Sequence, residues 1–394
     1  MSDRADFLII GGGIAGASLA VELARLGSSV TVLERSHVGA GSSSVNAGGI
    51  RQQFLQPLNI RLAAETIHHV ERFAREHGEE VGFRQTGYLL IHDDPALVAP
   101  LRAAIAVQNQ LDVPSRMVSL TEASELVPGA DFDGVLGASY CPTDGYLDPR
   151  ALVTAYGRAA RRAGAEIVLA GVEAIEVEGG RVRAVRAGGR RFEAEVIVNA
   201  AGAWAPKLAR LYGGELPITP LRSEIFIFDR APVGGRLMPM VLDRAGRLSF
   251  HNEGRGVLVS AGVTAAVPDP DGPVEPEPAR FEDLRSRLSR RLPELADARL
   301  AQCWAGLVEV TEDFNPIVGW SHLENLFTYA GFSGHGMCIA PGLAPHAARL
   351  LRSEVPDVSL DAYRPDRFET GRPLAAESLW SGAARFQAAT GAPG

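Results

Sequence analysis

The sequence predicts an α/β fold that contains a dinucleotide-binding domain of Rossmann type and a further region that is mostly β-structure. Two observations lead to this prediction. A glycine-rich turn stands between an apolar run and a helical pattern near the start of the chain, and a second apolar run follows and ends in an acid. With 394 residues the chain is long for one domain, so we expect two domains or one elaborate α/β unit.

The first element is a strand at Phe7 to Ile10, followed by a tight turn and a helix within the stretch LIIGGGIAGASLAVELARLG. Gly11, Gly13 and Gly16 fit the pattern G-x-G-x-x-G. In that geometry the first glycine makes the turn, the second lets a pyrophosphate approach the backbone, and the third lets helix and strand pack closely. Apolar residues at helical spacing then mark a helix that Gly27 can close.

The second strand, Ser29 to Leu33, ends in Glu34, which is placed as expected for the acid that bonds a ribose 2′-OH. Phosphates at the glycine turn would face the helix N-terminus, where free N–H groups and the positive end of the helix dipole favour an anion. The alternative is a Gly-rich turn without a ligand, and the order strand, turn, helix, strand and acid argues against it. We therefore predict a dinucleotide, and Glu34 argues against a 2′-phosphate on it.

The next elements follow from helical periodicity and capping. Pro57 to His77 carries apolar residues on one helical face. The run from Gly82 to His92 is typical of a strand, and a helical segment follows near Leu97 to Gln110. Asp148, followed by a proline, then provides an N-cap and Gly164 a stop, so the nucleotide-binding fold is expected to resume there.

The second half of the chain alternates apolar and polar residues in short runs. Residues 166 to 198, with Gly-Gly pairs at 179–180 and 188–189, predict a three-strand meander of tight hairpins. The meander ends in VNAAGAWAP, whose small residues suit backbone lying against a ligand as well as a tight packing turn. Residues 217 to 262 are strand-like, and Pro268 to Pro278 is predicted to be an exposed linker.

A helix is predicted near residues 281 to 291. Further on, Gly331, Gly334 and Gly336 precede a helix that would run to about Leu351. This pattern implies a second helix N-terminus with close backbone approach.

Composition argues against several classes of function. The formal net charge is −8 and no block of basic residues could track phosphates, so we expect no nucleic-acid partner. The start MSDRADFLII lacks a charged region followed by a long apolar stretch, and no later run approaches the ~18 to 20 apolar residues of a membrane span, so we expect a cytoplasmic chain. Cys141, Cys303 and Cys338 lie far apart, which predicts neither a disulfide framework nor a metal site.

Four ordered signals resemble the FAD-dependent D-amino-acid oxidase superfamily, and within it the branch of sarcosine oxidase, dimethylglycine dehydrogenase and glycine oxidase. They are the glycine turn with Glu34, then DGYLDPRAL, VNAAGAWAP, and GFSGHGM after WAGLVEVTEDFNPIVG. The resemblance implies an FAD-binding domain and a mostly antiparallel substrate-binding domain with helices, each discontinuous in sequence. The expected boundaries are 1–82, 142–214 and 309–371 for the FAD-binding domain, 83–141 and 215–308 for the substrate-binding domain, and 372–394 for a C-terminal tail.

The resemblance also implies which residues contact FAD. GSSSVNAGGIRQQF stands where the family contacts pyrophosphate and flavin, and GFSGHGM is similar to the loop whose following helix aims its N-terminus at the flavin pyrimidine. Reduction leaves negative charge there, which helix N–H groups stabilise. The expected FAD contacts are Gly11, Gly13, Ile14, Ala15, Gly16, Glu34, Arg35, Ser42, Ser43, Ser44, Ala47, Gly48, Gly49, Val172, Ala200, Ala201, Gly202, Trp204, Gly306, Gly331, Ser333, Gly334, His335, Gly336 and Met337.

Two departures from the family pattern bear on chemistry. Monomeric sarcosine oxidases carry a cysteine that bonds the flavin; at the matching place, before Asp313, this chain has Gly306, so we expect non-covalent FAD. Those oxidases also carry a lysine, two residues after GHG, that pairs with an arginine to hold the substrate carboxylate. Cys338 stands at the lysine's place, and the arginine remains as Arg51.

Arg51, His251 and His335 are the candidate catalytic residues. A guanidinium fits a carboxylate through paired hydrogen bonds, so Arg51 is expected to bind substrate rather than face solvent or phosphate. His251, on a predicted strand of the substrate domain, is either substrate-facing or solvated. His335, between two glycines, is either a flavin contact or a loop residue packed on the sheet. None is expected to be a general base, since alignment with the flavin can supply much of the catalysis.

The resemblance predicts FAD-dependent oxidation of the C–N bond of a secondary or N-substituted amino acid (N-alkyl glycine, glycine or proline-like) to an imine that water hydrolyses. The alternatives are a 2-hydroxy-acid dehydrogenase of the same superfamily and a non-catalytic FAD-binding subunit or assembly factor. Whether the chain forms a homo-oligomer or a hetero-oligomer stays open.

The electron acceptor is either O2 or another carrier. Lys207 is the only lysine and is expected to point away from the flavin, so residues 217 to 308 offer no lysine to stabilise the anion formed when oxygen reacts. This absence favours another carrier, although His251, His335, Arg51 or Arg222 could supply the charge.

Overall fold

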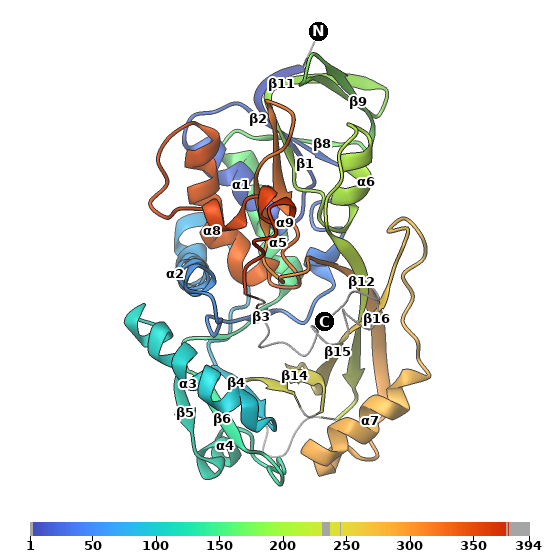
Figure 1. The fold of residues 1–394 in the computed structure, drawn as a ribbon. Helices are drawn as coiled ribbons and strands as arrows, with labels where there is room; N and C mark the ends of the chain where they lie inside the picture. Colours follow the sequence, from blue (N-terminus) through green and yellow to red (C-terminus); the bar gives the residue numbers. More distant parts are fainter. Residues whose placement is uncertain (1–2, 231–236, 245, 376, 378–394) are drawn as a thin grey trace.

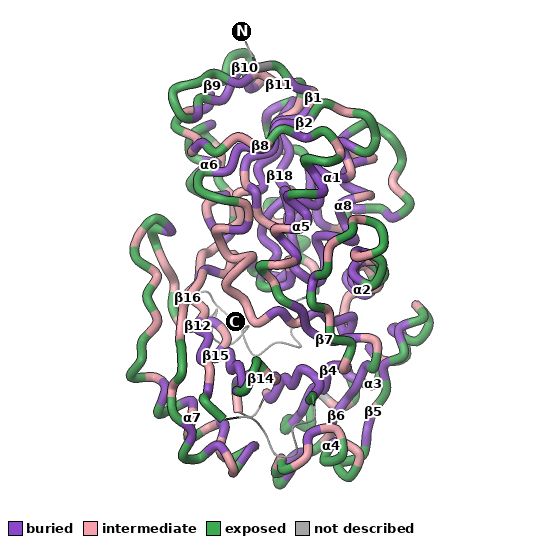
Figure 2. The backbone as a smooth tube through the Cα atoms, turned by 180° about the vertical axis from the view of Figure 1, so that it is seen from behind, coloured by how far each residue is buried: buried purple, intermediate pink, exposed green. Residues whose placement is uncertain are grey.

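The computed structural model describes residues 3–230, 237–244, 246–375 and 377 of the 394-residue chain. Two large sheets organise the molecule, one in the upper part of Figure 1 and the other in the lower part. Buried backbone runs through the centre of both parts, whereas exposed residues follow the outer loops and helix faces (Figure 2).

The upper sheet is the predicted Rossmann-type sheet. Its main path has the order β17-β18-β11-β1-β2-β8, in which β17 is antiparallel to β18 and all other neighbours are parallel. The strands of this path are β1 (Asp3–Ile10), β2 (Val30–Glu34), β8 (Glu166–Leu169), β11 (Arg190–Asn199), β17 (Ile317–Trp320) and β18 (Leu326–Ala330).

Helices cover one face of this sheet and a β-meander covers the other. Because side chains alternate along a strand, Phe7 and Ile9 of β1 pack among the helices, whereas Leu8 and Ile10 pack toward the meander and a short helix. The helices of the first face are α1 (Ile14–Arg25), α2 (Pro57–His77), α5 (Pro149–Arg162) and α8 (Gly336–Leu351). The other face carries β9 (Val172–Glu178), β10 (Arg181–Ala187) and α6 (Ala205–Arg210).

The predicted helix ends are confirmed where capping residues specified them. The Asp148 side chain accepts hydrogen bonds from the backbone N–H groups of Arg150 (2.9 Å) and Ala151 (3.1 Å) at the start of α5. Gly164, just beyond α5, has φ +104°, a conformation that glycine adopts without strain.

Two predicted β-regions are wrong in detail. Residues 166–199 hold four strands, not three, because β8 pairs with β2 in the parallel sheet and only β9, β10 and β11 form the meander. The predicted strand from Gly82 is regular only over β4 (Tyr88–His92). Gly82 and Gly87 have φ of +65° and +84°, and these left-handed positions break the extended run.

The lower sheet is antiparallel except where β13 runs parallel to β4, and its order is β16-β12-β15-β14-β13-β4-β6-β5. A large apolar core lies between this sheet and α7 and α4. The strands are β5 (Arg116–Val118), β6 (Gly137–Cys141), β12 (Thr219–Phe228), β13 (Met240–Asp243), β14 (Leu248–Glu253), β15 (Gly256–Ala266) and β16 (Leu300–Val310). The helices are α3 (Pro95–Gln110), α4 (Leu120–Leu126) and α7 (Arg280–Arg291).

A two-stranded sheet of β3 (Gly49–Ile50) and β7 (Gly145–Tyr146) lies at the level between the two large sheets. The short helical segments are η1 (Ser42–Ser44), η2 (Gly202–Trp204), η4 (Pro293–Leu295), η5 (Asp361–Tyr363) and α9 (Asp366–Glu369). The proposed domain boundaries stay a prediction, and β16 runs continuously through the one proposed between residues 308 and 309. Most of the predicted tail, 378–394 and residue 376, lies outside the described residues.

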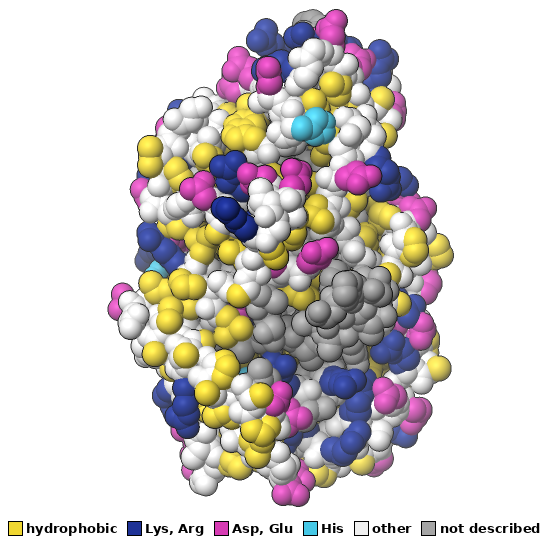
Figure 3. Space-filling model, viewed as in Figure 1, with side chains coloured by type: hydrophobic (Ala, Val, Ile, Leu, Met, Phe, Trp, Pro, Cys, Tyr) yellow, Lys and Arg dark blue, Asp and Glu magenta, His cyan; other side chains and the backbone are white. Residues whose placement is uncertain are grey.

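No helix in the described residues is both long and apolar enough to cross a bilayer. Within the same ranges, no group of three or more His, Cys, Asp or Glu side chains is arranged to hold a metal ion. Basic and acidic side chains are interspersed over the face of the molecule that Figure 3 shows.

Candidate functional site

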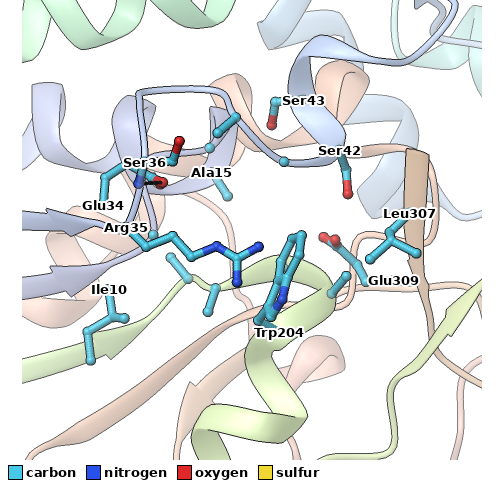
Figure 4. Close-up of a pocket in the computed structure, with 18 of the residues that line it drawn as sticks. Ile10, Ala15, Glu34, Arg35, Ser36, Ser42, Ser43, Trp204, Leu307 and Glu309 are labelled. Carbon is cyan, nitrogen blue, oxygen red and sulfur yellow. Dashed lines mark hydrogen bonds between the residues drawn. The ribbon is translucent and has the colours of Figure 1, made fainter. Parts of the chain in front are cut away.

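A cavity of ≈ 620 Å³ lies where the carboxyl ends of β1, β2 and β11 face the edge strand β16 of the lower sheet (Figure 4). This is the place where open parallel sheets bind ligands, because the loops that follow the strands diverge there. The cavity is long enough to be lined by both the β1–α1 turn and the residues just before α8.

The three glycines of the first turn lie in different surroundings. A Cβ on Gly11, which has φ +114°, would lie 2.4 Å from the Ala200 carbonyl oxygen, and a Cβ on Gly16 would lie 2.0 Å from the Gly11 carbonyl oxygen. Gly13 instead borders the cavity, and its nearest atom would be Ser43 Oγ at 3.1 Å. Gly11 and Gly16 therefore permit backbone packing, whereas Gly13 keeps space open for a ligand.

The N-terminus of α1 faces this space without an acidic side chain in its first turn. The Ile14 N–H donates a hydrogen bond to Ser43 Oγ at 2.9 Å, which ties the η1 segment over the helix end. Free N–H groups and the helix dipole give this end of the cavity a preference for an anion.

Glu34 ends β2 and lines the same cavity. Its Oε2 accepts from the Gly12 N–H at 2.8 Å and its Oε1 accepts from the Ser36 N–H at 3.0 Å. These bonds hold the carboxylate in place and leave further lone pairs for a ligand hydroxyl. Contact of Glu34 with a ribose stays a prediction.

Most of the expected FAD contacts are brought together here. Those that line the cavity are Gly11, Gly13, Ile14, Ala15, Glu34, Arg35, Ser42, Ser43, Val172, Ala200, Ala201, Gly202, Trp204, Gly306, Gly334, Gly336 and Met337. Those expected contacts that lie outside its lining are Gly16, Ser44, Ala47, Gly48, Gly49, Gly331, Ser333 and His335. Several of these shape its walls: Ser333 Oγ, for example, donates to the Gly331 carbonyl at 3.1 Å within the turn before α8.

The predicted exposed linker, residues 268–278, is largely exposed, as expected, and forms a strap in the β15–α7 connection that brings Asp271 to the cavity. Asp271 lines the cavity, accepts from Trp204 Nε1 at 2.8 Å and forms ion pairs with Arg35 and Lys207. The Arg35 guanidinium lies 4.1 Å from the Trp204 ring centroid. Asp271 and Asp269 hold the amino group of Lys207 where it lines this cavity. That Lys207 points away from the flavin itself stays a prediction.

Arg51 is buried, with 4% of its surface exposed, just beyond β3. It donates to the Gln53 carbonyl and to His335 Nε2, the latter at 3.3 Å, and its guanidinium lies 4.2 Å from the Phe54 ring centroid. It forms no ion pair with a carboxylate among the residues that the structure describes. The buried carboxyl of Glu377 interacts electrostatically with Arg51 but forms no ion pair with it. A buried cation without a paired carboxylate is costly, so this place favours an anion.

His335 is buried at the N-cap of α8 and packs edge-on against Phe54, with ring centroids 5.2 Å apart. Burial, and then the charge of Arg51, lower the pKa of His335 to about 3. The ring is therefore neutral, and its Nε2 accepts a hydrogen bond from Arg51. Its side chain positions Arg51 rather than lining the large cavity.

The two readings of His251 left by the sequence are both wrong. The side chain is neither solvated nor free to meet a substrate, because it is 2% exposed and stacks on Tyr146 with ring centroids 4.1 Å apart. Its Nε2 lies 2.9 Å from the Ala47 carbonyl and its Nδ1 lies 2.7 Å from the Asn252 carbonyl. Burial lowers the pKa of His251 to about 4, so this neutral ring fastens the loop before β3 to the lower sheet.

Cys338, which replaces the family's lysine, is buried with its thiol 3.5 Å from the Gly49 carbonyl oxygen. Burial raises the pKa of this thiol to about 11. Cys338 therefore stays uncharged and adds no second cation beside Arg51.

Sequence reasoning missed Asp144, which supports the loop that carries Arg51. Its buried carboxylate accepts from the Gln52 backbone N–H at 2.9 Å and from Gln53 Nε2 at 3.2 Å. Burial raises the pKa of Asp144 to about 6, opposed by the hydrogen bonds from both glutamines. Two features of the sequence could have predicted this contact: the Asp-Gly pair that begins DGYLDPRAL, and the two glutamines that follow Arg51.

A family model described as FAD dependent oxidoreductase (DAO) matches residues 6–350. Mouse (Mus musculus) mitochondrial dimethylglycine dehydrogenase is 27% identical, over 93% of this chain and 44% of its own length. The crystal structure of L-proline dehydrogenase from P. horikoshii is 30% identical, with a TM-score of 0.87 over 95% of this chain and 100% of the other. The crystal structure of glycine oxidase from Geobacillus kaustophilus is 25% identical, with a TM-score of 0.81 over 93% of this chain and 99% of the other.

Proposed function

The chain belongs to the FAD-dependent oxidoreductase (DAO) family, and from that membership we propose that it oxidises the C–N bond of a secondary or N-substituted amino acid to an imine, which water hydrolyses. The observation that carries the proposal is Arg51, a buried guanidinium with no carboxylate partner in the described part of the chain. The relatives named above are enzymes of proline, glycine and dimethylglycine, each of which carries one carboxylate.

The residues present fit FAD. The α1 N-terminus, with Gly13 and Ser43, would hold the pyrophosphate, and Glu34 would accept a hydrogen bond from the ribose. Bound FAD supplies the two-electron acceptor of the reaction. The first N–H groups of α8, at Gly336 and Met337, border the same cavity and would stabilise negative charge that develops there.

Arg51 would hold the substrate carboxylate by paired hydrogen bonds from the N–H groups that Gln53 and His335 leave free. Anchoring one end of a small amino acid also orients its C–H and nitrogen, which can supply much of the catalysis without a proton-abstracting side chain. His335 is not such a base, because its Nε2 already accepts from Arg51.

Anaerobic bleaching of the flavin tests the proposal. We would add N-alkyl glycines, glycine, proline, D-amino acids and 2-hydroxy acids in turn and record the flavin absorbance. Bleaching by an amino acid, weakened in Arg51→Met but not in the exposed control Arg158→Met, is the expected result. Bleaching by 2-hydroxy acids alone would contradict the proposal and indicate a 2-hydroxy-acid dehydrogenase. FAD that no member of the panel reduces would point to a non-catalytic subunit.

A further inference from the structure

Glu309 is a carboxyl group on the wall of the FAD cavity that the sequence did not single out. It lies on β16, and its side chain packs against the backbone of Gly202, where a Cβ would be 2.9 Å from Glu309 Oε2. Figure 4 shows the carboxyl beside Trp204, with Ser42 and Leu307 near it. Gly202 has φ +53°, a conformation that glycine adopts without strain, and its missing side chain lets the carboxyl approach the backbone.

The cavity offers Glu309 no counter-ion. It forms no ion pair within the ranges that the structure describes, and no charged side chain contributes to the shift of its pKa. The other charged or titratable groups that line the cavity are Glu34, Arg35, His37, Glu173, Lys207 and Asp271. The two cations of this set, Arg35 and Lys207, are both held by Asp271.

The elements packed against Glu309 do not supply a free cation either. Arg222, on the neighbouring strand β12, pairs with Glu224 and Glu277. The segment before α8 carries His335, whose ring accepts from Arg51 rather than turning to the cavity. Burial raises the pKa of Glu309 to about 7, against backbone hydrogen bonds at Phe332 and at Glu309 itself that lower it.

FAD would increase the cost of a negative charge at this place. Its pyrophosphate is anionic, and its bulk would displace water from the cavity that Glu309 faces. A nearby like charge and desolvation both favour the uncharged form of a carboxyl group. The uncharged form also carries an O–H that can donate a hydrogen bond, whereas a carboxylate can only accept.

We propose that Glu309 is a positioning residue for FAD that binds the cofactor as a protonated acid and donates a hydrogen bond to it. FAD binding then takes up a proton at alkaline pH. At the acidic end of the range the acid is already protonated without FAD, so the affinity of the protein for FAD does not change with pH there. Above about pH 7 the free protein must first be reprotonated, so the dissociation constant rises toward about tenfold per pH unit until the bound form also ionises. This inference does not depend on the identity of the substrate.

The test measures FAD binding to the apoprotein by titration calorimetry from pH 6 to 9, in buffers of different ionisation enthalpy. The wild type should take up nearly one proton at pH 8 and lose affinity above pH 7. Glu309→Gln keeps the size and a hydrogen-bond donor but cannot ionise, so it should bind without proton uptake and with nearly constant affinity. Glu195→Gln and His68→Gln, both exposed and outside the cavity lining, should retain the wild-type profile.

Two results would overturn the proposal. One is wild-type binding without proton uptake at pH 8. The other is a Glu309→Gln protein that keeps the wild-type proton uptake, or whose affinity at pH 6 falls tenfold or more although its melting temperature as apoprotein is unchanged. If Glu309→Gln does not fold, the proton uptake of the wild type and of the two control variants still decides the question. Loss of the proton uptake in either control would assign the proton to a group other than Glu309.

Discussion

Replacement of Arg51 by methionine separates a substrate-binding role from a structural one. Methionine keeps an apolar stem of similar length against Phe54 but removes the charge and the bonds to Gln53 and His335. Since the guanidinium has no carboxylate partner in the described chain, its loss removes a buried charge rather than breaking an ion pair. We therefore expect the melting temperature of Arg51→Met without substrate to be unchanged or higher.

The effect on turnover should be large. A hydrogen bond to a charged group is worth about 1.5–3 kcal/mol, which corresponds to about a 10- to 150-fold fall in kcat/KM. The loss should appear mainly as a higher KM if the carboxylate is held equally in the ground and transition states, and in kcat if it also aligns the C–H. Arg51→Lys should recover part of the loss, because it restores charge without the planar fork.

The assay is steady-state reduction of a dye by the best amino acid of the bleaching panel, with FAD content measured by absorbance. Arg158→Met, on the outer face of α5, should behave as wild type. A fall in FAD content or in melting temperature of Arg51→Met, with kcat/KM per bound FAD unchanged, would refute the reasoning and show that Arg51 serves the fold or the cofactor.

Four further outcomes are expected. Gly13→Val should fold but not bind FAD, because its methyl groups enter the cavity beside Ser43; normal flavin content would contradict the assigned turn. FAD should be released by acid or heat, since Gly306 has no side chain to bond it, and yellow colour on the denatured chain would show otherwise. Asp271→Asn should speed the loss of FAD on dilution, followed by flavin fluorescence, because the strap loses its ion pairs; an unchanged rate would mean that the strap does not cover the cofactor. Anaerobically reduced enzyme should reoxidise in air-saturated buffer more slowly than it reduces a dye, since Lys207 is held at the cavity mouth by Asp271; reoxidation within a turnover time, with release of hydrogen peroxide, would make it an oxidase.

Elements whose signals lie within one turn or one hairpin could be predicted from the sequence. The β1–α1 turn follows from three glycines within six residues, and the start and end of α5 follow from Asp148 and Gly164. The four ordered motifs identified the family, and one cavity is lined by most of the residues that were expected from them to contact FAD. Each of these depends on backbone conformation or on small residues, which local sequence specifies directly.

Only the tertiary structure decided what the charged side chains do. Arg51 and His335 are 284 residues apart, and His251 and Ala47 are 204 apart, so no local pattern could pair them. Residues 268–278 have the composition of a surface linker, and Asp271 becomes part of the cavity only because the fold carries the strap to Arg35 and Lys207. Whether a carboxyl or imidazole is charged depends on its burial and its partners, and both are properties of the folded chain rather than of the residue's neighbours in sequence.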